Sequence, residues 1–241
     1  MSRVPVPIVA LDVPDTAAAM TLLDRIGPAA GFVKVGLQLF VSEGPAVVRA
    51  VRERGARVFL DLKLHDIPNT VARAVESAAK LDVELLTLHA SGGARMLRAA
   101  REAAGARGGE GPRLLAVTVL TSLPATELRD AWGRGSVDVE AEAARLARMA
   151  SDAGMDGVVA AVREAAAIRA AAGERLRILA PGIRRAGDAA GDQARVATPG
   201  QAAEAGVDYV VVGRTVTAAD DPAAAMDEVL RDLRGQPADA A

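Results

Sequence analysis

The chain of 241 residues could form one large domain or two small ones, and a hydrophobic content of 51% is ample for a core. A net charge of −2 and the lack of any Lys/Arg-rich block argue against nucleic-acid binding, and the absence of cysteine excludes disulfides, thiolate metal sites and cysteine nucleophiles. Asp12, Asp15 and Asp24 interrupt the N-terminal region, and no apolar run reaches the ~18 residues of a membrane span. We therefore expect neither a signal peptide nor a membrane partner, and a cytoplasmic location.

Short apolar runs of strand length alternate with amphipathic stretches of helix length along the whole chain. The expected strands are 7–11, 32–35, 57–61, 85–89, 114–120, 157–161, 177–180 and 209–213. The expected helices are 15–25, 44–54, 70–80, 94–104, 139–153, 163–171, 201–205 and 222–234. Strands that alternate with helices pair in parallel through crossovers, which predicts an α/β fold.

Eight repeats of strand and helix favour a closed (β/α)8 TIM barrel with its active site at the C-terminal ends of the strands. The alternative is a doubly wound open sheet, but no Gly-x-Gly-x-x-Gly turn follows the first strand. No linker suggests a second domain, so we expect a single domain over 1–241 with its core at about 5–234 and a frayed tail.

The segment 182–200 lacks a convincing apolar period, although it is long for a connection in a compact domain. Segments of this kind are often functional, and this one follows the seventh strand on the face where barrel enzymes bind substrate. We therefore expect it to act as a lid over the site.

Lysine is rare in this chain, which has only three lysines among its 29 basic residues. Two of them, Lys34 and Lys63, fall at the ends of predicted strands beside carboxylates. An arginine cannot release a proton in a protein, whereas a lysine ammonium can, so the choice of Lys suggests proton delivery.

Asp61 and Lys63 are two positions apart on a strand and should therefore point to the same face. The alternative interpretation is a structural ion pair at the rim of the barrel. Asp12, Lys34 and Asp66 should approach the same place, and a cluster of alternating charges is costly to desolvate. A functional charged network is the favoured interpretation.

The expected loops after the seventh and eighth strands carry Arg184 and Gly213-Arg214, with Gln193 between them. Loops at this place in barrels commonly bind phosphate, and two arginines can hold one phosphate together. The alternative is that they are ordinary solvated arginines. Asn69 or Thr70 could cap the helix that follows Pro68.

Motifs at most strand ends resemble those of the orotidine 5'-phosphate decarboxylase family. The matching segments are Ala10-Leu11-Asp12, Phe32-Val33-Lys34-Val35-Gly36, Asp61-Leu62-Lys63-Leu64-His65-Asp66-Ile67-Pro68-Asn69-Thr70, Val117-Thr118-Val119-Leu120-Thr121-Ser122, Ala180-Pro181-Gly182-Ile183-Arg184, Asp192-Gln193-Ala194-Arg195-Val196-Ala197-Thr198-Pro199 and Val211-Val212-Gly213-Arg214. Such collinear matches are far more specific than any single motif.

The resemblance implies conversion of orotidine 5'-phosphate (OMP) to UMP and CO2 in de novo pyrimidine biosynthesis, with no metal and no organic cofactor. It implies that Lys63 donates a proton to C6 of the pyrimidine and that Asp61 lies beside the departing carboxylate. It further implies a homodimer with shared active sites. The remaining implied roles are ribose binding by Asp12 and Lys34, entry of Asp66 and Thr70 into the partner's site, contact of Thr121 with the pyrimidine, and substrate or phosphate binding by Pro181, Arg184, Gln193, Gly213 and Arg214.

Two alternatives stay open at this point. A Mg2+-dependent sugar-phosphate enzyme, of the hexulose-phosphate synthase or keto-gulonate-phosphate decarboxylase type, would share the Asp-x-Lys-x-x-Asp spacing. The Ile67-Pro68-Asn69-Thr70 extension and Asp192-Gln193 favour the pyrimidine enzyme. The second alternative is a catalytically silent nucleotide-binding barrel. The roles of His65 and His89 are left open, because a lone histidine is more often structural than catalytic.

Overall fold

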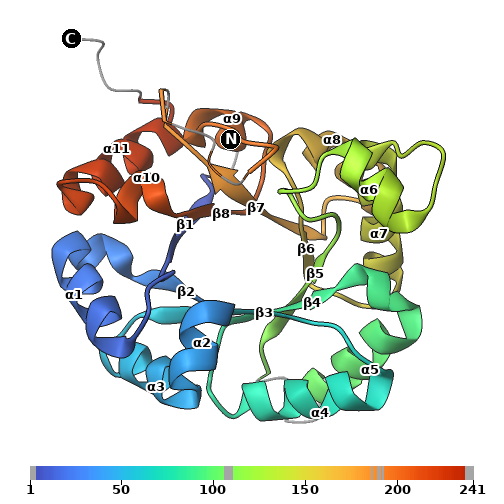
Figure 1. Cartoon of the computed structure of the whole chain (residues 1–241), viewed down its shortest axis with the longest axis horizontal. Helices are drawn as coiled ribbons and strands as arrows, with labels where there is room; N and C mark the ends of the chain where they lie inside the picture. Colours follow the sequence, from blue (N-terminus) through green and yellow to red (C-terminus); the bar gives the residue numbers. More distant parts are fainter. Residues whose placement is uncertain (1–3, 106–110, 186, 189–190, 192, 237–241) are drawn as a thin grey trace.

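The computed structural model describes residues 4–105, 111–185, 187–188, 191 and 193–236. Eight parallel strands close into a barrel in chain order, with the helices in a ring outside them (Figure 1). The strands are β1 (Val6–Ala10), β2 (Phe32–Gly36), β3 (Arg57–Leu64), β4 (Leu85–His89), β5 (Arg113–Val117), β6 (Gly157–Val159), β7 (Arg177–Ile183) and β8 (Tyr209–Val212). The predicted (β/α)8 barrel is confirmed, and the open-sheet alternative is wrong because β8 pairs with β1.

The helices follow the expected order, with additional short helices on several loops. The α-helices are α1 (Thr16–Ile26), α2 (Leu37–Glu43), α3 (Pro45–Glu53), α4 (Pro68–Ala79), α5 (Gly93–Gly105), α6 (Ala125–Trp132), α7 (Val139–Asp152), α8 (Ala165–Ala172), α9 (Pro199–Glu204), α10 (Arg214–Thr217) and α11 (Pro222–Leu233), and the 3-10 helices are η1 (Gly27–Ala30), η2 (Ala90–Gly92) and η3 (Val162–Glu164). None of the described helices is long and apolar enough to cross a membrane.

Strand β3 is three residues longer than predicted, and its pairing with β4 is irregular. Leu60 pairs with Leu86 and Leu64 pairs with Leu88, so β3 uses two more residues than its neighbour over this stretch. Lys63 lies inside this bulge with a φ of 50°. Bulges of this kind re-aim side chains and are common beside active sites.

The barrel interior contains most of the few aromatic rings in the chain. Phe32, Phe59 and Tyr209 pack there with aliphatic side chains, and the Phe32 and Tyr209 rings meet edge to face with centroids 6.3 Å apart. A larger cluster rich in Val, Leu and Ala fills the space between the strands and the helices. The interior is thus a packed core, and a cavity opens at its C-terminal end.

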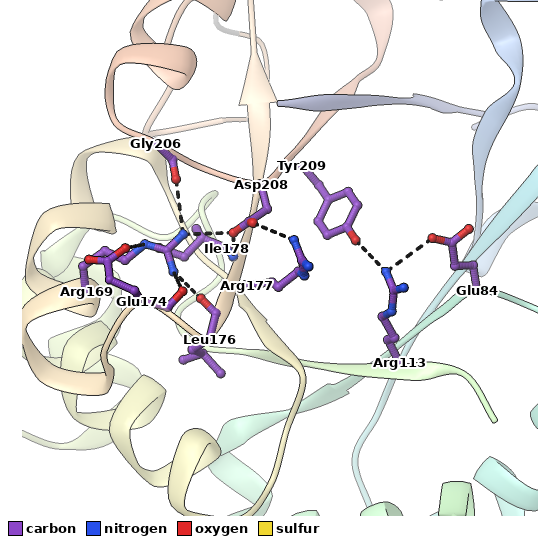
Figure 2. A network of polar contacts seen from close by, with 10 residues as sticks. All are labelled: Glu84, Arg113, Arg169, Glu174, Leu176, Arg177, Ile178, Gly206, Asp208 and Tyr209. Carbon is purple, nitrogen blue, oxygen red and sulfur yellow. Dashed lines mark hydrogen bonds and ion pairs between the residues drawn. The ribbon is translucent and has the colours of Figure 1, made fainter. Parts of the chain in front are cut away.

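A network of polar contacts holds the N-terminal end of the barrel together (Figure 2). Asp208, just before β8, accepts hydrogen bonds of 2.9 Å from Arg169, Arg177 and the backbone N–H of Ile178. The adjacent Tyr209 hydroxyl accepts a 3.1 Å bond from Arg113. Because barrel enzymes carry their active sites at the other end, we expect this network to serve stability.

We expect Asp208→Asn to lower the stability of the fold without impairing the site. The amide keeps one acceptor but loses the charge that faces two guanidinium groups, at a cost of about 1–3 kcal/mol. Chemical denaturation would measure the change. Asp152→Asn is the matched control, because its pair with Arg148 is exposed and should contribute almost nothing. Equal stability of the two variants would contradict a structural role for Asp208.

Candidate active site

A cavity of about 560 Å³ opens at the C-terminal end of the barrel. Its floor is apolar and includes Phe59 and Val159 from the barrel interior. Its rim is polar. The polar and charged lining residues are Asp12, Lys34, Asp61, Lys63, Thr121, Ser122, Arg184, Gln193, Arg214 and Thr217. An apolar pocket with a few convergent polar groups is the usual form of a small-molecule site.

Four charged residues form a continuous chain on one side of this cavity. Lys34 Nζ lies 2.7 Å from Asp12 Oδ1 and 3.9 Å from Asp61 Oδ2, while Lys63 Nζ lies 2.7 Å from the same Asp61 oxygen. Lys34 and Asp61 are each only 8% exposed. The structure therefore brings these four expected side chains together, with their charges alternating. The expectation that Asp66 approaches the same place is not met within the chain, because Asp66 is exposed and does not line the cavity.

Thr87, on β4, holds the Asp61–Lys63 segment in place. Its fully buried hydroxyl donates to Asp61 Oδ1 at 2.8 Å and accepts from the backbone N–H of Lys63 at 3.0 Å. The backbone N–H of Lys63 in the bulge therefore has a hydrogen-bond partner. The Asp61 carboxylate is held by Thr87 at one oxygen and by Lys63 Nζ at the other. The only sequence signal for Thr87 was one hydroxyl residue within the apolar run 85–89.

The opposite side of the cavity is formed by the residues predicted to bind phosphate. Arg184, Gln193, Gly213 and Arg214 line it together with Pro181. Thr121, from the loop after β5, donates a 2.5 Å hydrogen bond to Gln193 Oε1. Asp192, the neighbour of Gln193 in the quoted motif, lies outside the described residues.

Asp66 and Thr70 do not line the cavity of their own chain. Both are exposed, and the Asp66 carboxylate accepts a 2.6 Å hydrogen bond from the backbone N–H of Ile67. The prediction that Asn69 or Thr70 caps the next helix is wrong. Helix α4 begins at Pro68 with Ile67 at its N-cap, which places both residues inside the first turn.

Comparison with known proteins identifies the family of this barrel. The model of the Orotidine 5'-phosphate decarboxylase / HUMPS family matches residues 5–229. The chain belongs to this family. It is 51% identical to the orotidine 5'-phosphate decarboxylase of Moorella thermoacetica over 94% of this chain and 91% of that protein, and 48% identical to that of Sodalis glossinidius over 96% and 91%. The crystal structure of the enzyme from Lactobacillus acidophilus aligns with a TM-score of 0.83 at 35% identity, covering 96% of this chain and 99% of that one.

In this member of the decarboxylase family, two histidines lie next to the charged network. The rings of His65 and His89 are tilted by 40° with their centroids 5.3 Å apart. Burial lowers the pKa of His89, and the nearby His65 and Lys63 lower it further. The lowered pKa favours the neutral imidazole of His89, which carries no second positive charge toward Lys63.

A metal centre is not evident in the part of the chain that the structure describes. There, no group of three or more His, Asp and Glu side chains is arranged to hold a metal ion. Whether the reaction needs a metal is a separate question, which the effect of EDTA on turnover would answer.

Proposed function

We propose that this protein converts OMP to UMP and CO2 in pyrimidine nucleotide biosynthesis. The observation that carries the proposal is the Asp12–Lys34–Asp61–Lys63 chain on one side of a cavity whose other side holds two arginines. A nucleoside monophosphate has an anionic phosphate at one end and a base at the other. Arg184 and Arg214 suit the phosphate, which leaves the base and its carboxylate beside Lys63.

The chemistry assigned to Lys63 follows from the electron pair that CO2 leaves behind. When the bond from C6 to the carboxylate breaks, this pair stays in the plane of the ring, where the ring π system cannot delocalise it. An ammonium placed beforehand at C6 stabilises the developing charge. Lys63 then transfers its proton to C6 as the new C–H bond forms, and the neutral amine regains a proton from solvent.

Asp61 acts on both Lys63 and the substrate in this proposal. Its carboxylate is 2.7 Å from Lys63 Nζ and is fixed by Thr87, so it holds the ammonium in position. It also stands beside the substrate carboxylate, and the repulsion between the two is relieved as CO2 leaves. Lys34 and Asp12 bind the ribose hydroxyls, and Thr121 contacts the pyrimidine.

The phosphate supplies binding free energy that is used at the reacting centre. Arg184, Gln193, Gly213 and Arg214 bind it at the far side of the cavity from Lys63. Contacts to a part of the substrate that does not react can position the part that does. We expect the segment 182–200 to close over the phosphate when substrate binds.

Loss of the orotate ultraviolet absorbance after mixing purified protein with OMP, with and without EDTA, tests the proposed reaction. Fast loss that EDTA leaves unchanged supports cofactor-free decarboxylation. Loss that EDTA abolishes contradicts the metal-free mechanism and directs attention to the Mg2+-dependent sugar-phosphate enzymes of the same family. No loss with OMP, together with UMP binding, would favour the silent nucleotide-binding barrel.

A cytoplasmic location stays a prediction that cell fractionation would test.

We further propose that two copies of the chain share their active sites. Asp66 and Thr70 are exposed in a single chain, and between them Ile67 is 67% exposed. Leu37 and Val41 on α2 are exposed as well. Apolar side chains exposed beside an active site are suited to burial against a second copy, which would carry Asp66 and Thr70 into the partner's cavity.

Mixing two inactive variants tests this arrangement. We expect Lys63→Ala and Asp66→Ala to be nearly inactive alone. A mixed dimer has one site with both changes and one site with neither, so re-associating equal amounts should restore about a quarter of the parent activity. As the control, Lys63→Ala is taken through the same re-association alone and should stay inactive. An equal mixture that stays as inactive as its components, or an active monomer, would contradict shared sites.

A further inference from the structure

Arg195 is a buried arginine that the proposed chemistry does not use. Its side chain is 2% exposed, and its donors point at backbone carbonyls of the loop after β5. Nη1 donates to the carbonyl of Leu123 at 2.6 Å, and Nη2 donates to those of Val119 and Leu120 at 3.2 and 3.1 Å. One guanidinium thus joins the loop after β7 to the loop after β5.

Glu164 pairs with the remaining nitrogen of this guanidinium, Nε, which does not contact the loop carbonyls. Its side chain is fully buried, and its Oε1 lies 3.0 Å from Arg195 Nε. These two atoms have no hydrogen-bond partner among the described residues, so the ion pair is what compensates them. Glu164 Oε2 accepts a 2.9 Å bond from the backbone N–H of Ala161, which ties the pair to the loop after β6.

Removing both charges of this ion pair from water costs free energy, which is unfavourable for a contact that only stabilises the fold. Burial raises the pKa of Glu164 and lowers that of Arg195, and each is opposed by the charge of the other. Buried ion pairs of this kind seldom stabilise a fold more than apolar side chains of similar size would. What apolar side chains could not supply is the fixed geometry of three loop carbonyls around one planar group.

The loops that Arg195 joins contribute residues to the wall of the cavity. Two residues before Arg195, Gln193 accepts the Thr121 hydroxyl, and the backbone N–H of Ala194 donates to the Thr121 carbonyl at 3.1 Å. The Arg195 carbonyl lies so close to Gly182 that a Cβ there would come within 2.9 Å of it. A shift of Arg195 would therefore move Gln193 and Thr121 together.

We propose that Arg195, held by Glu164, is a positioning residue that places Gln193 against Thr121 for capture of the phosphate-bearing substrate. The inference rests on the proposed decarboxylation of OMP and adds a role that acts through Gln193. Arg195 itself does not reach the cavity, since it is not among the lining residues. Its effect on turnover should disappear when Gln193 can no longer act.

A double-mutant cycle tests this dependence. We expect Arg195→Met to lower kcat/KM for OMP by about 100-fold, since a displacement of about 1 Å can cost that much. In a Gln193→Ala background the same change should cost less than about threefold, because interacting residues are not additive. Asp208→Asn is the control for lost stability alone, and it should leave kcat/KM unchanged in both backgrounds when assayed well below its melting temperature.

The double variant Glu164→Gln/Arg195→Met separates positioning from stability. Removing both charges should restore the melting temperature relative to either single variant. It should not restore kcat/KM, because the loop carbonyls still lack their donor. Equal losses in the two Gln193 backgrounds, or kcat/KM that returns with stability, would overturn the positioning role. A parent protein that does not turn over OMP would overturn the proposed reaction and this role with it, and the assay of the parent shows which has failed.

Discussion

Replacing Lys63 by alanine should abolish decarboxylation and leave the barrel folded. The change removes the ammonium that lies 2.7 Å from Asp61 and with it both the proton donor and the positive charge at C6. General acid catalysis contributes about 10²–10⁴-fold, and loss of one preorganised electrostatic contact costs a further ~10²–10³-fold. We therefore expect kcat to fall by at least ~10⁴-fold. Orotate absorbance measures the loss, and circular dichroism checks the fold.

Two further lysine variants make this result specific. Lys80→Ala is the matched control, because Lys80 is exposed at the end of α4 and should not affect turnover. Lys63→Arg keeps the positive charge but cannot release a proton, so we expect it to be inactive as well. Substantial turnover by Lys63→Ala would contradict the proton-donor role. Substantial turnover by Lys63→Arg alone would mean that charge, and not proton transfer, is the contribution of this residue.

Replacing Arg214 by alanine should lower kcat/KM for OMP by about 10²–10⁴-fold, and added guanidinium should restore part of the loss. Arg214 opens α10 at the end of β8 and lines the cavity, where a charge-assisted, two-pronged contact to phosphate is available. A soluble cation can occupy the space left by the side chain. Initial rates at increasing guanidinium concentration give the extent of rescue.

Arg49→Ala serves as the control, because Arg49 is exposed on α3, in the outer ring of helices. It should match the parent, and guanidinium should not accelerate either protein. An Arg214→Ala variant that behaves like the parent would show that the phosphate lies elsewhere. A large loss with no rescue would indicate that Arg214 shapes the loop after β8 and does not bind the anion directly.

The sequence by itself determined the barrel and most of the polar residues that line the cavity. Strand and helix lengths alternate without a break, and in a parallel barrel the C-terminal ends of the strands meet on one face. Asp12, Lys34 and Asp61 therefore had to converge once their strands were assigned, and the structure brings them within salt-bridge distance. The family followed from motifs at the same strand ends. The single-domain organisation stays a prediction.

Only the tertiary structure decided how these charges are held. Regular alternation predicted the direction of Lys63, whereas the side chain is directed by a bulge with a positive φ that is visible only when β3 is paired with β4. Thr87 and Asp61 meet across 26 residues, and Arg195 reaches Val119 across 76. In a chain rich in arginine, no local pattern distinguishes the buried Arg195 from a solvated one. Its role depends on which loops the closed barrel brings together, and that is a property of the packed fold.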